Sequence, residues 1–266
     1  MYLQFWNLKE RPFENTPDPK FLYHSAQHEE GLSRLLYVVR EGKGAGLLTG
    51  TYGCGKTLLS RALSRELEGD IFKVAYITNP RLTDTEMLKT ILHLLGGSQI
   101  PQGKGEILIA LEKILSSNAR DGKKTVVVVD EAHAIEDPLL FEEIRLLLNY
   151  QTDDSFLLTL LLLGQDELKD KVAQIKQLDQ RLALRFHLAA LRQEEAAGYV
   201  NHRLVIAGAK NEIFDEGALA MVFHRSGGIP RRINQICDMS LLTAMSHKSS
   251  KVTEPMVHEA VESLDK

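Results

Sequence analysis

The sequence predicts an α/β protein in which a parallel β-sheet is flanked by helices and is followed by a small all-helical domain. Two observations predict this fold: apolar runs alternate with helical patterns from Gly44 to Leu191, and no strand-like run follows. Strands that are apolar at every position are buried on both faces, as in parallel sheets between helical layers. We expect an amino-terminal segment (1–43) packing on the core, the α/β core itself (44–191) and a helical domain (192–266).

Hydrophobic periodicity gives the elements in order. After a proline-punctuated start, EEGLSRLLYVVREG has the apolar stripe of a helix. The expected strands are GAGLLTG (44–50), FKVAYIT (72–78), TVVVVD (125–130), FLLTLLLLG (156–164) and RFHLAAL (185–191). Helical patterns lie between them at 57–68, 83–96, 104–119 and 137–150. The last four helices are expected in RQEEAAGYVNHRLVIAGA, DEGALAMVFHRSGG, PRRINQICDMSLLTAMS and TEPMVHEAVESL.

Composition restricts the class of protein. The 266 residues are 44% hydrophobic and 26% charged, as in ordinary globular chains, and the net charge of −4 gives no general indication of a nucleic-acid or membrane partner. Two cysteines, Cys54 and Cys237, favour a reducing compartment over a disulfide framework. No secretory signal is visible, and the run 156–164 is far shorter than the ~20 residues of a membrane span. We therefore expect an intracellular chain without a membrane span.

The stretch GTYGCGKT (50–57) matches the phosphate-binding pattern GxxxxGK[ST] in full. In such a P-loop, backbone N–H groups and the positive end of the following helix surround a phosphate chain. We expect Lys56 to reach the β- and γ-phosphates of ATP and Thr57 to ligate Mg²⁺. A glycine-rich turn with a surface lysine is the structural alternative, but the position between a strand and a helix favours the nucleotide. The expected nucleotide-binding residues are Gly50, Thr51, Tyr52, Gly53, Cys54, Gly55, Lys56, Thr57 and Leu58.

An acidic pair ends the apolar run TVVVVDEAH. Asp130 is suited to hold Mg²⁺, and Glu131 to orient and deprotonate an attacking water, which points to hydrolysis rather than binding alone. A strand running into a turn can carry the same letters, but the order of the two motifs favours the catalytic interpretation. His133 is expected to form local hydrogen bonds rather than to ligate a metal, since the nine histidines show no metal-ligand spacing.

With both motifs placed, the chain resembles the AAA+ ATPases, and within them the general secretion pathway protein A (ExeA-like) family. The resemblance rests on YLQFWNLKERPFENTPDPKFLY, the glycine loop, DEAH, LLLLGQDEL, LDQRLALRFHLAAL and GGIPRRIN, and so covers nearly the whole chain. It implies a P-loop NTPase sheet followed by a helical lid. The chain departs from the family pattern at Thr51, Tyr52, Cys54 and Asp166, which affects mainly the outer face of a loop.

The resemblance also implies further catalytic roles. Gln165 matches a polar residue that senses the γ-phosphate, and Arg231 matches a lid arginine that contacts the nucleotide. Arg181 or Arg185 matches an arginine finger supplied to a neighbouring subunit, and Arg181 is the preferred candidate because Arg185 could begin the fifth strand as a solvated charge. A finger of this kind implies a homo-oligomeric ring or filament.

Two functions remain open. One is assembly or remodelling of a bacterial envelope machine for secretion or pilus biogenesis, with a protein partner and a cytoplasmic place of action at the inner face of the cell membrane. The other is DNA-binding regulation of transposition or replication initiation. Residues 190–266 hold nine Lys/Arg and ten Asp/Glu, a difference of −1, so nucleic acid is the less favoured partner. A nucleotide switch without turnover is a third class, which Glu131 argues against.

Overall fold

The computed structural model describes residues 2–265 and confirms the expected fold. Five strands form one parallel sheet in the order β2-β3-β4-β1-β5. They are β1 (Ala45–Gly50), β2 (Phe72–Ile77), β3 (Lys124–Val129), β4 (Leu158–Leu163) and β5 (Leu182–Leu188). β1 lies between β4 and β5, with Leu47 opposite Leu162 and Arg185. The phosphate loop, which follows β1, therefore begins at an internal strand of the sheet and not at an edge strand.

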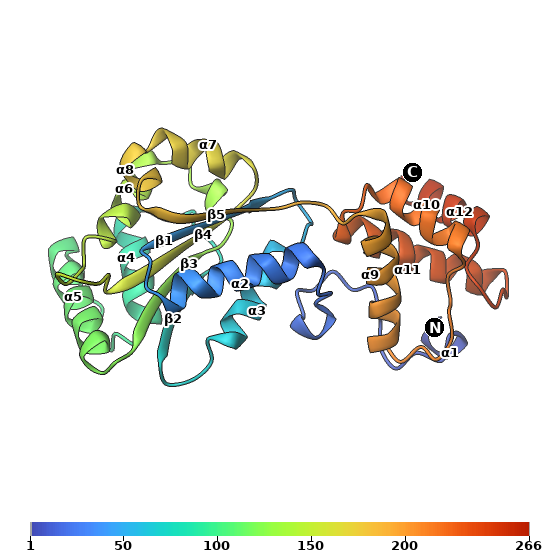
Figure 1. Ribbon diagram of the computed structural model, residues 1–266, viewed down its shortest axis with the longest axis horizontal. Helices are drawn as coiled ribbons and strands as arrows, with labels where there is room; N and C mark the ends of the chain where they lie inside the picture. Colours follow the sequence, from blue (N-terminus) through green and yellow to red (C-terminus); the bar gives the residue numbers. More distant parts are fainter. Residues whose placement is uncertain (1, 266) are drawn as a thin grey trace. The chain divides into compact units, whose positions relative to one another are not determined.

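Helices surround the sheet and form the carboxy-terminal domain (Figure 1). They are α1 (Tyr2–Phe5), α2 (Ala26–Arg40), α3 (Lys56–Glu66), α4 (Asp84–Leu94), α5 (Lys104–Arg120), α6 (Pro138–Leu147), α7 (Glu167–Gln174), α8 (Lys176–Asp179), α9 (Gln193–Ile206), α10 (Glu216–Ser226), α11 (Pro230–Ser246) and α12 (Glu254–Leu264), with 3₁₀ turns η1 (Pro19–Phe21) and η2 (Ala132–Ala134). The helices α1, α7 and α8 span only four, eight and four residues, which is shorter than the stretch over which periodicity indicates a helix.

The chain divides into two compact units, which are described separately. The sheet unit comprises Glu29–Thr51 and Leu59–Leu188, and its largest core packs one face of the sheet on α4, α5, α6, α7 and α8. The lid unit comprises the amino-terminal residues through His28, the loop Tyr52–Leu58 and the residues from Ala189 onward. Its core joins Trp6, Leu8 and Phe13 to helices α9–α12. The first part of the segment expected on the nucleotide core thus packs with the helical domain, whereas α2 belongs to the sheet unit.

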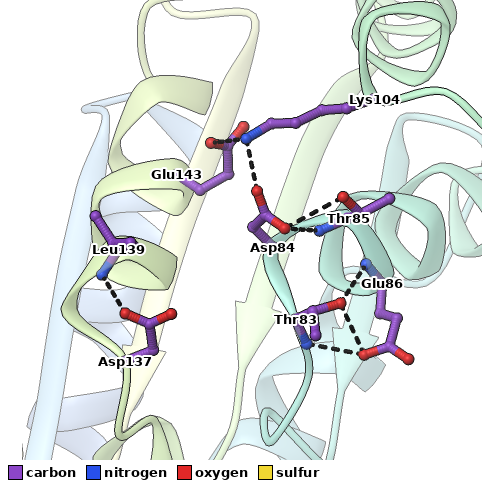
Figure 2. Close-up of polar contacts among 8 residues, drawn as sticks. All are labelled: Thr83, Asp84, Thr85, Glu86, Lys104, Asp137, Leu139 and Glu143. Carbon is purple, nitrogen blue, oxygen red and sulfur yellow. Dashed lines mark hydrogen bonds and ion pairs between the residues drawn. The ribbon is translucent and has the colours of Figure 1, made fainter.

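Local signals explain where several helices begin. At α4, Thr83 caps the helix and exchanges hydrogen bonds with Glu86, which satisfies backbone donors that a helix leaves open (Figure 2). At α6, Asp137 accepts from the backbone N–H of Leu139. Glycine in the left-handed conformation at Gly227 (φ 60°) ends α10.

A lysine holds three helices of the sheet unit together. Lys104, at the start of α5, donates to Asp84 of α4 and to Glu143 of α6, both at 2.7 Å (Figure 2). The Glu143 side chain is only 10% exposed, and a buried carboxylate is costly unless it is paired. The ammonium group of Lys104 supplies that pairing. The hydrogen bond from Lys104 lowers the pKa of the Asp84 carboxyl group. The same hydrogen bond is the largest cause of the raised pKa of Lys104.

Strand β5 begins three residues earlier than its apolar run predicts. The sequence places it at 185–191, but it spans Leu182–Leu188 and its residues alternate between buried and exposed positions. As an edge strand, β5 needs only a half-buried pattern, and LALRFHL supplies one. Arg185 therefore lies inside the strand and Arg181 directly before it.

Candidate functional site

The phosphate loop connects the carboxyl end of β1 to the first turn of α3, as the motif requires. Its residues Thr51–Gly55 are irregular, and Lys56 begins the helix. Gly53 (φ 86°) and Gly55 (φ 101°) adopt conformations that side chains rarely reach. Lys56 is only 6% exposed, and Thr57 and Leu58 occupy the same first helical turn. A loop with these dihedrals at a helix N-terminus presents backbone donors suited to phosphate.

A buried histidine supports the loop within the lid unit. His28 Nε2 lies 3.3 Å from the carbonyl oxygen of Cys54, and its Nδ1 lies 2.7 Å from Ser25 Oγ. A carbonyl only accepts, so Nε2 carries the proton and Nδ1 accepts from the Ser25 hydroxyl. Burial lowers the pKa of His28, which keeps this ring neutral. Sequence patterns predict no role for His28, because a contact across 26 residues leaves no local pattern.

Tyr52 and Gly53 contact the start of α11 in the same unit. The Arg231 guanidinium lies 4.4 Å from the centre of the Tyr52 ring and donates to its hydroxyl. The backbone N–H of Arg231 donates to the Gly53 carbonyl (3.2 Å), and a Cβ at Gly53 would come within 2.9 Å of Arg231 Cβ. The expected lid arginine is therefore brought to the phosphate loop, with Tyr52 as its partner.

Asp130 follows β3 at the carboxyl edge of the sheet, the edge at which β1 also ends. Its carboxylate is 3% exposed, accepts the Tyr76 hydroxyl through Oδ2 (2.9 Å) and accepts the Glu131 N–H through Oδ1 (2.9 Å). Burial raises the pKa of Tyr76, which therefore remains a donor. Two donors fix the carboxylate and leave further lone pairs for a cation. Tyr76, on β2, had no sequence signal beyond its place in an apolar strand.

Glu131 occupies the left-handed region (φ 53°, ψ 31°) at the start of η2. A non-glycine residue in this region stores strain of about 1–3 kcal/mol, and such residues cluster at functional sites. The Glu131 side chain is 42% exposed, and its Oε2 lies 3.2 Å from His133 Nδ1. Gln165, which follows β4, lies on the other side of the same imidazole ring. The structure thus brings Asp130, Glu131 and Gln165 to one edge of the sheet, with His133 between the last two.

The two candidate finger arginines lie away from that edge and contact their own chain. Arg181 precedes β5 and donates to the Leu148 carbonyl (3.0 Å) and to Asn149 Oδ1 (3.1 Å). Arg185 forms an ion pair with Asp179 at 2.7 Å and leaves 47% of its side chain exposed. Arg181 lies at the amino end of its strand, whereas the phosphate loop and Asp130 follow carboxyl ends. Neither arginine is placed to serve the acidic pair of its own sheet unit.

Each of the two units holds one residue whose chemistry suits Mg²⁺. Asp130 offers a buried carboxylate and Thr57 a hydroxyl in the first turn of α3, which are the oxygen ligands that Mg²⁺ prefers alongside phosphates and water. Across residues 2–265, three or more His, Cys, Asp or Glu side chains nowhere form a cluster able to hold a metal.

Comparisons with known proteins agree with this arrangement. A family model described as AAA domain matches residues 39–172. General secretion pathway protein A of Aeromonas hydrophila is 41% identical over 258 residues, which are 95% of this chain and 46% of that protein. ORC1-type DNA replication protein 1 of Halobacterium salinarum is 25% identical over 91% of this chain and 78% of its own length. The expected resemblance to general secretion pathway protein A is thus confirmed, although the chain spans about half of that relative.

Solved structures support the fold. The Aeropyrum pernix ORC2 protein, solved as ADPNP–ADP complexes, superposes with a TM-score of 0.73 at 19% identity and covers 96% of this chain and 71% of its own. At this identity the likeness concerns the fold alone. No helix within residues 2–265 is long and apolar enough to cross a membrane. The matched residues contain the phosphate loop, Asp130, Glu131 and Gln165 and make up half of the sequence, so the chain belongs to the AAA domain family.

Proposed function

We propose that the chain is a Mg²⁺-dependent ATPase that assembles or remodels a bacterial envelope machine of the secretion or pilus type. The 41% identity to general secretion pathway protein A over 95% of the chain carries this proposal. Because the chain spans 46% of that relative, the partner and the machine are inferred from the relative's name. A cytoplasmic place of action at the inner face of the cell membrane follows from the same proposal.

In the proposed reaction, each residue has a distinct task. The phosphate loop binds the β- and γ-phosphates through backbone N–H groups and Lys56, while Thr57 and Asp130 hold Mg²⁺. The bound ion neutralises the charge that develops on the phosphates. Glu131 takes a proton from the attacking water, Gln165 contacts the γ-phosphate, and Arg231 contacts the nucleotide from the lid.

Two substitutions test hydrolysis. Lys56→Ala removes the cation at the phosphates and should weaken nucleotide binding, whereas Lys113→Ala, at an exposed position of α5, is the matched control. Glu131→Gln keeps the side-chain volume but removes the base, so nucleotide should still bind while turnover falls by about 10²–10⁴-fold. Fluorescent-nucleotide titration and phosphate release with and without EDTA measure both effects. Hydrolysis by Glu131→Gln at the parent rate would contradict the assignment of the base.

We further propose a head-to-tail homo-oligomer in which Arg181 or Arg185 reaches the nucleotide of the next subunit. Such an interface closes a ring or extends a filament, so specific activity should rise with protein concentration. A mixture of Arg181→Ala and Lys56→Ala should regain activity, because some sites then pair an intact pocket with an intact finger. Asn149→Ala removes one contact that Arg181 makes in its own chain and controls for a structural role. If light scattering shows mixed assemblies that remain inactive, the same mixture with Arg185→Ala tests the second arginine.

DNA binding is the second candidate function, since one relative is named as a DNA replication protein. The chain's net charge of −4 and the difference of −1 over residues 190–266 oppose it. We expect at most weak, salt-sensitive association with duplex DNA in fluorescence anisotropy. Tight, ATP-dependent binding at ~150 mM salt, where long-range contacts are largely screened, would reverse the preference.

A further inference from the structure

A series of hydrogen bonds within the sheet unit runs from α3 to Asp130. Ser60, on α3, places its Oγ 2.5 Å from the hydroxyl oxygen of Tyr76, on β2. The Tyr76 hydroxyl in turn lies 2.9 Å from Asp130 Oδ2, directly after β3. Ser60 is 0% exposed and Asp130 is 3% exposed, so both ends of the series are shielded from water. Three elements that are far apart in the sequence thus meet at one phenol group.

The direction of these hydrogen bonds follows from the groups that make them. A carboxylate only accepts, so Tyr76 donates its single hydroxyl proton to Asp130. The Tyr76 oxygen then accepts from Ser60, whose hydroxyl is the donor. Hydrogen bonds aligned in one direction polarise one another, so the bond from Ser60 strengthens the bond from Tyr76. Ser60 therefore acts on Asp130 through the Tyr76 hydroxyl.

The Asp130 carboxylate is held from two sides. Oδ2 accepts from Tyr76, and Oδ1 accepts from the backbone N–H of Glu131 at 2.9 Å. A carboxylate has about four acceptor sites, so each oxygen keeps capacity for a cation while the two donors restrict rotation of the group. Without the Tyr76 hydroxyl, one oxygen loses its donor and the carboxylate gains rotational freedom. Partners that orient a metal-ligating side chain typically change metal affinity by about 10–100-fold when they are removed.

We propose that Tyr76 is a positioning residue for Asp130 as a ligand of Mg²⁺, and that Ser60 supports it through the Tyr76 hydroxyl. This inference rests on the proposed role of Asp130 in holding the ion. Tyr76 and Ser60 act on the ion through the carboxylate, whose orientation they set before the ion binds. A hydroxyl that only satisfies its neighbours inside the fold would leave metal affinity unchanged, and this difference decides between the two roles.

The first test needs neither nucleotide nor metal. With ¹³Cζ-tyrosine labelling, the Tyr76 signal is identified among seven tyrosines by its loss in Tyr76→Phe. We expect this signal to shift in Asp130→Asn, because a neutral amide polarises the hydroxyl less than a carboxylate does, and in Ser60→Ala, which removes the donor. Tyr150→Phe removes another hydroxyl of the sheet unit, which donates to the Leu108 carbonyl (3.2 Å), and should leave the signal in place. An unshifted signal in either Asp130→Asn or Ser60→Ala would overturn the inference, whether or not the protein hydrolyses ATP.

The second test measures how much Mg²⁺ each variant needs to bind a fluorescent, non-hydrolysable ATP analogue. Tyr76→Phe should require about tenfold more Mg²⁺ for half-maximal binding, and Ser60→Ala about two- to threefold more. The double variant should match Tyr76→Phe alone, because Ser60 has no route to Asp130 once the phenol hydroxyl is gone. Affinity measured in EDTA should be the same in all of these variants, whereas a variant damaged in its fold would lose affinity in EDTA as well. Tyr150→Phe is again the matched control and should need as much Mg²⁺ as the parent.

The outcomes separate this inference from the proposed function. An unchanged Mg²⁺ requirement in Tyr76→Phe would overturn the positioning role. A double variant that loses the product of the two single effects would show that Ser60 acts independently of Tyr76 and would overturn its part. A parent protein that binds the analogue equally well in Mg²⁺ and in EDTA would instead contradict the proposed role of Asp130, and the ¹³C signals would still decide whether the hydrogen-bond series exists.

Discussion

Arg203 provides the sharpest prediction about stability. This α9 residue is 3% exposed and forms no ion pair with an acidic side chain of residues 2–265. Its guanidinium donates to the carbonyls of Pro12 (2.5 Å) and Glu14 (2.9 Å) and to the Tyr199 hydroxyl (2.8 Å). It also lies 4.7 Å from the centre of the Phe21 ring. A buried cation of this kind fastens the amino-terminal segment to the helices of the lid unit.

Arg203→Met keeps an apolar stem but removes every donor. Each hydrogen bond from a charged group contributes about 1.5–3 kcal/mol, and each carbonyl left buried without a donor costs about 1–3 kcal/mol. Because these contributions overlap and the desolvation of the cation opposes them, we expect a net loss of about 3–5 kcal/mol in the free energy of unfolding. Arg203→Lys should lose less, since an ammonium group retains some of the donors but not the planar fork.

Urea denaturation followed by Trp6 fluorescence measures this loss, because Trp6 is the chain's single tryptophan and lies in the core of the lid unit. Limited proteolysis should cut the amino-terminal segment faster in Arg203→Met than in the parent. Arg225→Met, at an exposed position of α10, is the matched control and should change stability by less than about 0.5 kcal/mol. If Arg203→Met costs less than about 1 kcal/mol, the segment is held by apolar packing and the reasoning about the buried cation fails.

Three further predictions concern the loop, its support and the helical layer. Burial holds the pKa of His28 below its ordinary 6.5, so stability present above pH 6.5 should fall as the pH drops below 6.5, and His28→Gln should flatten that fall in urea titrations. Tyr52→Ala removes the ring under Arg231 and should increase amide hydrogen exchange in the loop, whereas Tyr52→Phe should keep most of the protection. Lys104→Met should lower the free energy of unfolding by about 1 kcal/mol, because it strands Glu143 although the lysine itself is partly solvated.

The sequence predicts the fold and the motif positions because both depend on local patterns. Runs such as TVVVVD are apolar at successive positions only when helices cover both faces of a strand, and the glycine loop needs its place between strand and helix. Five expected strands are observed, and four of them begin within two residues of the expected position. The exception is β5, an edge strand whose alternating pattern is weaker than the apolar run that follows it.

The contacts that organise the candidate site could not be predicted, because each joins residues far apart in the chain. Tyr76 and Asp130 are separated by 54 residues, and His133 and Gln165 by 32. Nothing in FKVAYIT distinguishes a tyrosine that holds a carboxylate from one that only packs. Parallel strands explain the result, since they carry the ends of separate segments to one edge of the sheet.

The same geometry explains the hydrogen bonds of His133. In sequence it is one histidine among nine, two residues after an acidic pair, and the expectation of local hydrogen bonds is correct as far as it goes. The fold adds that β4 ends beside β3, so the residue after β4 meets the turn that follows β3. The strand order therefore explains why residues 32 positions apart in the chain meet at this imidazole ring.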